Sequence, residues 1–280
     1  MEKVYVSGDF GEFNFYDSIE SIKDIEGYSE RVDPKVESFD VIVGWYKLKD
    51  GKMTRCQKVD CQQMHNTGYV IRLKSGCVTN IGNICGKEFD PDNFIIQERL
   101  AKNKIRHYLV AQRVSEMRGE VDKYIELVNE VERLARDFMN AKGDFKRGVE
   151  GGEKIFGHLV GMAKRSDYAV IRTRTLSDAE YEEARKIRER PARVVHEEIG
   201  RIAYASCFSI EEHVIYLKAK KNLQALQSVN IERSTTPQLQ KVVKDVSEIG
   251  NGCDVLRKAL LEFDKFVNYP RNKELLPFIL

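Results

Sequence analysis

The sequence contains no long apolar run and no recognisable export signal. In 280 residues no apolar stretch approaches the roughly 20 residues that cross a bilayer, so we expect no membrane-spanning helix and no membrane partner. The first residues, Met-Glu-Lys-Val-Tyr-Val-Ser-Gly, lack the apolar core of a signal peptide. We therefore expect a cytoplasmic protein, in a bacterium or in a phage-infected host cell, whose cysteines stay reduced.

Catalytic motifs are also missing. No carboxylate pair, nucleophile elbow, open metal triad or nucleotide loop occurs in an adequate context. The segment Glu150-Gly-Gly-Glu-Lys154, for example, lacks the Gly-Lys-Ser/Thr ending that holds phosphate and magnesium. We predict that the protein is not an enzyme, and we keep a hidden enzyme with a cofactor pocket among its helices as a third hypothesis.

The net charge is only +2, although 32% of the residues are charged. Hydrophobic residues make up 42% of the chain, and the mean hydropathy is -0.46. This composition favours long, solvated helices over a compact sandwich or barrel. A nearly balanced charge gives no global support to nucleic-acid binding, which would need a local basic patch.

Cysteine is concentrated in one stretch of thirty residues, which holds four of the six cysteines and one of the five histidines. Thiolate and imidazole suit zinc, and a structural zinc site takes four such ligands in a tetrahedron. We predict Cys56, Cys61 and Cys85 as ligands, with His65 or Cys77 as the fourth. We favour His65, because Cys77 follows a glycine at a hairpin bend. Four protein ligands leave no open position, so the zinc would be structural; the alternative is a set of ordinary buried thiols.

The order of features in residues 56–89 resembles the treble-clef or zinc-ribbon module found in many phage and plasmid proteins. That pattern has a cysteine pair, a nearby histidine, a hairpin with glycine at its bend, and an aliphatic-Gly-x-x-Cys ending. The matching residues are Cys56 and Cys61, His65, Gly76, and Ile81-Gly82-Asn83-Ile84-Cys85. The chain departs from it in the four residues between the first two cysteines and in Gln62 after the second.

The resemblance implies a setting and a role. An accessory protein of a phage or other mobile element would bind and block, or scaffold, a host protein complex. The second hypothesis is a nucleic-acid-binding zinc module, which would use cations in or beside the cysteine stretch: Arg55, Lys58, Arg72, Lys74 and Lys87. We interpret the mixed run of arginines and glutamates over 172–193 as a solvated face instead of a phosphate-binding strip.

Apolar residues spaced four and three apart predict two long helical seams of equal length. The first seam is Val110, Val114, Met117, Val121, Tyr124, Val128, Val131, Ala135 and Phe138. The second seam is Leu239, Val242, Val246, Ile249, Cys253, Leu256, Leu260, Phe263 and Val267. We expect the seams to meet within one chain or between chains, with a homo-oligomer and a protein partner as the outcome. A long amphipathic helix packed on its own domain is the alternative for the first seam.

Taken in order, the sequence predicts an α+β protein. Its parts are a zinc-binding, β-rich head over 1–93, a long coiled-coil helix over 94–142, a glycine-rich connector over 143–176, and a helical domain over 177–280. We expect strands at 4–6, 13–15, 39–48 and 169–175. Capping boxes at Ser177–Glu180 and Ser209–Glu212 predict helices over 178–190 and 210–228, and Pro191 is expected to open another.

Overall fold

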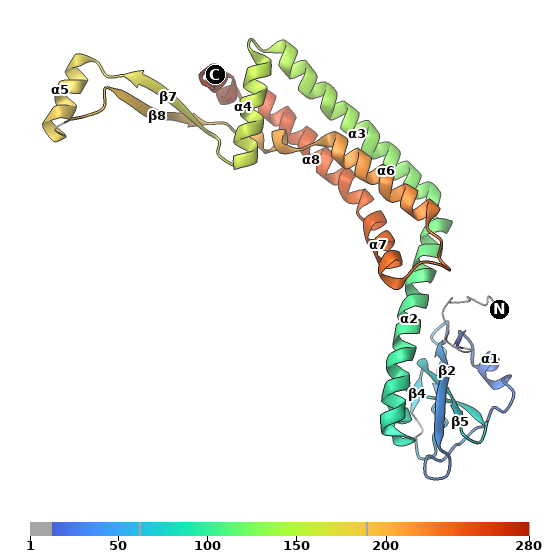
Figure 1. Ribbon diagram of the computed structural model, residues 1–280. Coiled ribbons are helices and arrows are strands. Elements are labelled where there is room, and N and C mark those ends of the chain that lie inside the picture. The colour runs from blue at the N-terminus through green and yellow to red at the C-terminus, as the bar shows by residue number, and fades with distance from the viewer. Residues whose placement is uncertain (1–12, 62, 189, 280) are drawn as a thin grey trace. The chain divides into compact units, whose positions relative to one another are not determined.

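The computed structural model describes residues 13–61, 63–188 and 190–279, and it confirms an α+β protein. Helix accounts for 58% of the described residues and strand for 17%, with a β-sheet region followed by a helical body. The chain divides into two compact units, drawn in Figure 1: Met1–Met117 with Val229–Val243, and Arg118–Ser228 with Lys244–Leu280. The strand predicted at 4–6 lies outside the described residues.

A four-stranded sheet organises the first unit, in the order β1-β2-β5-β6. β1 runs parallel to β2, whereas the β2–β5 and β5–β6 pairs are antiparallel. A separate short hairpin joins β3 to β4. The strands are β1 (Asn14–Tyr16), β2 (Phe39–Lys47), β3 (Thr54–Arg55), β4 (Met64–His65), β5 (Thr67–Leu73) and β6 (Val78–Ile81).

The sheet has an apolar core on each face, because alternate side chains of a strand point to opposite sides. On one side Tyr69 and Ile71 of β5 pack with Phe94, which belongs to α2 (Pro91–Gly119). On the other, Val70 packs with Ile22, which belongs to α1 (Ile19–Lys23). Most of α2 belongs to the first unit, and only its last residues, from Arg118 on, belong to the second.

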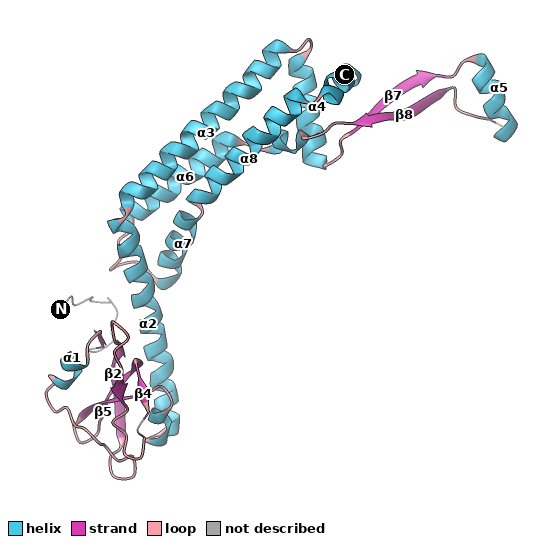
Figure 2. Ribbon diagram, turned by 180° about the vertical axis from the view of Figure 1, so that it is seen from behind, coloured by secondary structure: helices cyan, strands magenta, loops and turns pink. Residues whose placement is uncertain are grey.

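A helical bundle forms the core of the second unit (Figure 2). Phenylalanines from four of its elements meet edge to face around Phe208, whose ring centroid lies 4.8 Å from that of Phe266. The elements of this unit are α3 (Val121–Gly148), α4 (Gly152–Arg165), η2 (Ala205–Ser209), α6 (Glu212–Ser228), α8 (Ile249–Asn268), α9 (Pro270–Leu275) and η3 (Leu276–Phe278). The remaining helix, α7 (Thr236–Ser247), begins in the first unit and ends in the second.

The two predicted seams meet within one chain where α3 packs on α8. The rings of Phe138 and Phe263 lie 5.9 Å apart in an edge-to-face contact. Near the end of α8 the buried positions shift to Ala259 and Phe266, and Val267 of the predicted seam is exposed. A drift of this kind follows the 3.6-residue turn of a straight helix instead of a strict heptad. The seams therefore contribute to an intramolecular bundle, and assembly between chains stays a prediction.

A ribbon of two antiparallel strands leaves the bundle, as Figures 1 and 2 show. It consists of β7 (Ala169–Thr175) and β8 (Val194–Arg201), with α5 (Asp178–Ile187) between them. We call residues 169–201 the arm. The prediction of a helix opening at Pro191 is wrong, because the chain returns from α5 directly into β8.

Two further local predictions had different outcomes. The Ser177–Glu180 capping box is confirmed, with both reciprocal hydrogen bonds present. The Ser209–Glu212 box is wrong, because the Ser209 hydroxyl donates to the carbonyl oxygen of Ser206 and the Glu212 carboxylate binds Lys142. The glycine-rich interval expected to connect domains holds α4 over most of its middle.

Candidate metal centre

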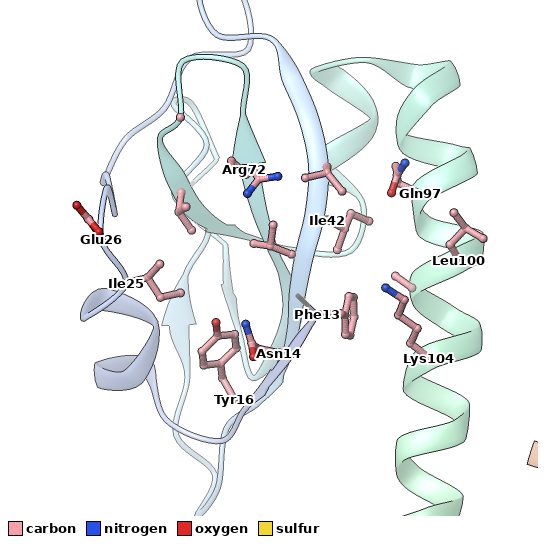
Figure 3. Close-up of a pocket in the computed structure, with 15 residues that line it drawn as sticks. Phe13, Asn14, Tyr16, Ile25, Glu26, Ile42, Arg72, Gln97, Leu100 and Lys104 are labelled. Atoms are coloured by element: carbon pink, nitrogen blue, oxygen red, sulfur yellow. The ribbon is translucent and has the colours of Figure 1, made fainter. Parts of the chain in front are cut away.

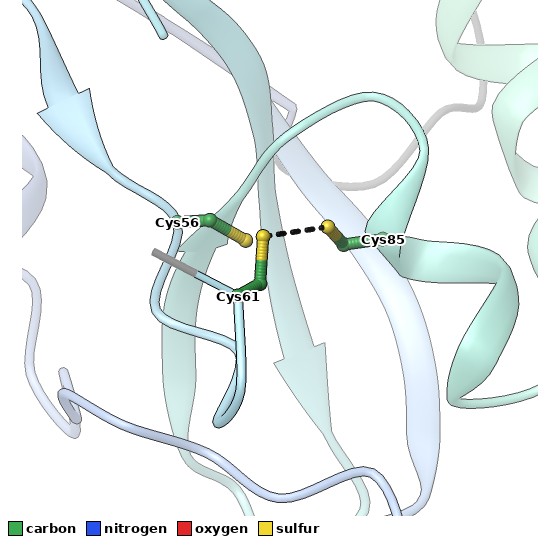
Figure 4. A group of neighbouring side chains, drawn as sticks. All are labelled: Cys56, Cys61 and Cys85. Atoms are coloured by element: carbon green, nitrogen blue, oxygen red, sulfur yellow. Dashed lines mark hydrogen bonds between the residues drawn. The ribbon is translucent and has the colours of Figure 1, made fainter. Parts of the chain in front are cut away.

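Three cysteine thiols converge in the first unit, as Figure 4 shows. The sulfur atoms of Cys56, Cys61 and Cys85 all lie within 4.8 Å of one another. The Cys85 thiol donates to the Cys61 sulfur at 3.4 Å. Two sulfurs on one tetrahedral zinc ion stand about 3.8 Å apart, as Zn–S bonds of about 2.3 Å require. The three thiols are therefore spaced as metal ligands are, and they can hold a metal ion.

Backbone hydrogen bonds place the first two thiols on a tight loop after β3. The Cys56 amide donates to the carbonyl oxygen of Gln63 at 3.0 Å, which continues the β3–β4 hairpin. The Cys61 amide donates to the carbonyl oxygen of Lys58 at 3.1 Å, which closes the turn. Asp60 adopts a left-handed conformation there, with φ of 68°. The loop thereby turns both sulfurs toward the same point.

The third thiol comes from the other end of the stretch. Cys85 begins the short helix η1 (Cys85–Glu88), and its amide donates to the carbonyl oxygen of Gly82 at 3.3 Å. A salt bridge of 2.6 Å between Lys58 and Glu88 ties the loop of the first two thiols to this helix. Gly86 is required beside it, since an added Cβ would lie 1.9 Å from the Phe94 ring.

Burial differs among the three thiols and shifts their acidity. Burial raises the pKa of the Cys56 thiol, and burial together with the neighbouring thiols raises that of the Cys85 thiol. At Cys61 the smaller effect of burial is outweighed by hydrogen bonds from the Gln63 backbone and the neighbouring thiols, so its pKa is lowered. Cys56 and Cys85 are buried, whereas Cys61 is half-buried. A metal ion would bind the thiolate forms of all three.

The structure does not bring His65 into the group of three sulfurs. Its two ring nitrogens have different surroundings. Its Nδ1 lies 2.8 Å from the hydroxyl of Tyr46, which in turn donates to the carbonyl oxygen of Ile81 at 3.3 Å. Its Nε2 is buried and has no hydrogen-bond partner among the described residues. Burial lowers the pKa of this imidazole, which favours the neutral form that binds metals.

Two glycines make room for this arrangement: Gly82, which belongs to the predicted aliphatic-Gly-x-x-Cys ending, and Gly68, which sequence analysis missed. An added Cβ on Gly68 would lie 2.4 Å from the Tyr46 hydroxyl, and one on Gly82 would lie 3.2 Å from Cδ2 of His65. The imidazole and the phenol thus occupy space that only glycine leaves open. Tyr46 was missed as well, because the residues it joins are far apart in the sequence.

The other predicted ligand, Cys77, stands apart from the thiol group. It follows Gly76, whose φ is 89°, at the bend between β5 and β6. Its half-buried side chain packs against the apolar core of the first unit. Within the described residues the group that can hold a metal is made of Cys56, Cys61 and Cys85.

A cavity of about 710 Å³ lies in the first unit (Figure 3). Apolar side chains of β2 and α2, such as Ile42 and Leu100, line it together with Arg72 and Lys104. The Arg72 guanidinium is paired with Asp40 at 3.2 Å. The cavity is separate from the thiol group, and none of the three cysteines lines it.

Comparison of the chain with known protein families, with curated proteins and with solved structures finds no match in any of the three. None of the described helices has an apolar stretch long enough to cross a membrane.

Proposed function

We propose that the protein is a non-enzymatic, zinc-stabilised interaction protein. The observation that carries the proposal is the convergence of Cys56, Cys61 and Cys85 in the unit that also holds a buried imidazole nitrogen of His65, for which the described residues supply no hydrogen-bond partner. Zinc is the metal that such a set of sulfur and nitrogen ligands suits. A cytoplasmic setting fits it, since reduced thiols bind metal.

His65 is our proposed fourth ligand. Metal-binding imidazoles hold their second nitrogen in a hydrogen bond, and here the Tyr46 hydroxyl holds Nδ1 and leaves Nε2 for the metal. Because His65 stands outside the group of sulfurs, binding requires the imidazole and the Cys56–Cys61 loop to approach each other. Four protein ligands would close the site, so the metal would stabilise the fold and would not activate water.

The helical second unit is our proposed platform for a protein partner. Val214 and Leu217 lie one turn apart on α6 and are exposed, as is Leu261 on α8. A contiguous exposed apolar patch marks a contact site on a protein surface, and these side chains are our candidates for one. In this proposal the protein forms homo-oligomers and, as an accessory protein of a phage or mobile element, blocks or scaffolds a host complex.

Metal content and solution mass, measured on the same sample, test this function. We expect about one zinc per chain in an oligomer. The variant Cys85→Ser should lose the metal, and Cys77→Ser is the matched control that should keep it. Loss of the metal should destabilise the first unit strongly, because structural zinc contributes on the order of 10 kcal/mol to small metal-dependent folds.

Cobalt substitution tests the fourth ligand. Tetrahedral cobalt bound to three thiolates and one imidazole absorbs visible light, and His65→Ala should shift that absorption. A metal-free, folded wild-type protein would contradict the proposed centre. A cobalt spectrum unchanged by His65→Ala would remove only the fourth ligand.

Nucleic-acid binding by the first unit receives less support from the structure. Two of the cations predicted to contact phosphate are already paired with carboxylates, Lys58 with Glu88 and Arg72 with Asp40. Ion pairs of this kind lower the positive potential that a phosphate would meet.

A further inference from the structure

The arm buries very few of its side chains. In β7 and β8 only Val170 is buried, and α5 has no buried residue at all. A ribbon of two strands is marginally stable by itself in water. A segment that buries so little within its own chain is suited to contact something outside it, and its charges indicate what.

Where the start of α5 meets the strands, acidic side chains of the arm are bound in ion pairs. Arg174 binds Glu180 at 2.9 Å and Glu197 at 2.8 Å. Arg193 binds Asp178 at 3.3 Å, and its guanidinium also lies over the Tyr181 ring. These pairs hold the start of α5 against the strands and neutralise that region.

The far end of α5 carries cations that these pairs leave out. Lys186, Arg188 and Arg190 are all exposed, and no described carboxylate forms an ion pair with them. Between residues 185 and 193 the sequence has five cationic side chains and one acidic one. We call Lys186, Arg188 and Arg190 the basic tip. Cations therefore outnumber carboxylates at this end of the arm.

A carboxylate also stands near the tip. Glu183 is exposed and lies three residues before Lys186 on α5, about 4.5 Å along a helix that rises 1.5 Å per residue. This is within the Debye length of about 8 Å at physiological ionic strength, so the positive potential at the tip depends on its excess of cations over carboxylates.

We infer that the basic tip binds the phosphate backbone of a nucleic-acid duplex. Arginine presents a planar fork that matches phosphate oxygens, and two of the three tip cations are arginines. A ribbon of two strands fits the major groove of a duplex. Ile187 is next to these cations in the sequence and is 91% exposed, so its apolar side chain can contact sugars or base edges.

An anionic membrane is the less favoured partner. Stable attachment to a lipid surface takes an apolar anchor in addition to a cationic patch. Ile187 is the only large aliphatic side chain described at the tip as strongly exposed. One such side chain gives little insertion, whereas contacts with phosphate need none.

Salt-dependent binding tests the inference on the full-length protein. The fluorescence anisotropy of a labelled duplex of about two helical turns is titrated with protein over a range of salt concentrations. The test variant combines Lys186→Gln, Arg188→Gln and Arg190→Gln. If each cation neutralises one phosphate, the slope of log K against log salt should become shallower by about 2.7.

Two control variants separate the tip from other sources of charge. One combines Lys123→Gln, Arg136→Gln and Arg147→Gln, exposed cations of α3 whose loss changes the net charge equally. The other combines Arg55→Gln and Lys87→Gln near the metal centre. Both should keep the wild-type slope, and circular dichroism should show that every variant is folded.

Three results would overturn the inference. They are a wild-type protein that does not bind the duplex, a tip variant with the same slope as the α3 control, and a loss confined to the variant near the metal centre. Binding to phosphatidylserine vesicles without binding to the duplex would assign the tip to membranes instead. The metal measurements do not depend on any of these outcomes.

Discussion

Lys142 on α3 forms a buried ion pair with Glu212 at the start of α6. Its Nζ lies 2.6 Å from the Glu212 carboxylate and 2.8 Å from the carbonyl oxygen of Ile210. The two side chains are 10% and 14% exposed. The same ammonium group lies 4.2 Å from the centroid of the Phe138 ring. The variant Lys142→Met keeps an unbranched side chain that is one atom shorter and removes the charge.

Lys142→Met should destabilise the second unit by about 3 kcal/mol. Removal of one partner of a buried pair costs about 3–5 kcal/mol, because the other charge stays buried without compensation. The lower end applies here, since Glu212 stands in the first turn of α6, where the helix dipole favours a carboxylate by up to about 1 kcal/mol. For a domain of 150–250 residues this corresponds to a melting temperature lower by about 6–12 °C.

A double-mutant cycle with Glu212→Leu measures the pair itself. The double variant should be within about 1 kcal/mol of the wild type, because apolar replacement of both partners leaves no buried charge. Urea unfolding followed by circular dichroism gives the free energies. Lys218→Met is the matched control, since Lys218 forms a 2.7 Å pair with Glu248 on the exposed surface. A cost for Lys142→Met no larger than for this control, or additive single costs in the double variant, would refute the reasoning.

Two further predictions concern backbone space and pH. Gly152→Ala should lower the melting temperature, because its Cβ would lie 2.3 Å from the carbonyl oxygen of Lys146. Gly157→Ala should raise the melting temperature, because its Cβ would have open space and alanine favours a helix. Equal shifts of the two variants in thermal unfolding would contradict this. A hydrogen bond from Arg174 holds the pKa of Glu180 at about 2, below its usual 4.5. Its stabilisation of α5 is therefore complete above about pH 4.5 and is lost as the pH falls toward 2. Amide exchange in α5 should report this loss, which Glu180→Gln should abolish.

Local spacing predicted most of the helices, because a helix depends on residues three and four positions apart. The two capping boxes show the limit of prediction from local spacing. Ser177 and Glu180 are exposed and have each other as nearby partners, so the box forms. Glu212 has the same spacing from Ser209, but Lys142 lies 70 residues away and binds its carboxylate. A buried charge gains more from an opposite charge than an exposed cap does, and no local pattern contains that information.

The candidate metal centre also has a part that local sequence predicts and a part that it does not. Cys56, Cys61 and Cys85 were predictable because metal ligands of small modules lie close in sequence and thiols are rare elsewhere in the chain. The hydroxyl that orients His65 was not, since Tyr46 belongs to a strand whose alternation indicates only burial. The contact joins β2, β4 and the end of β6, and it exists only once the sheet has formed.

The entry and exit of the arm coincide. The Ile202 amide donates to the carbonyl oxygen of Tyr168 at 2.9 Å, and the buried amide side chain of Asn272 holds Ala203 just beyond. A segment whose ends meet adds no gap to the structure beneath it, and compact domains tolerate insertions at such places. The arm can therefore be replaced as a unit. Shorter, longer or differently charged segments can be inserted between Tyr168 and Ile202 while the bundle keeps its packing.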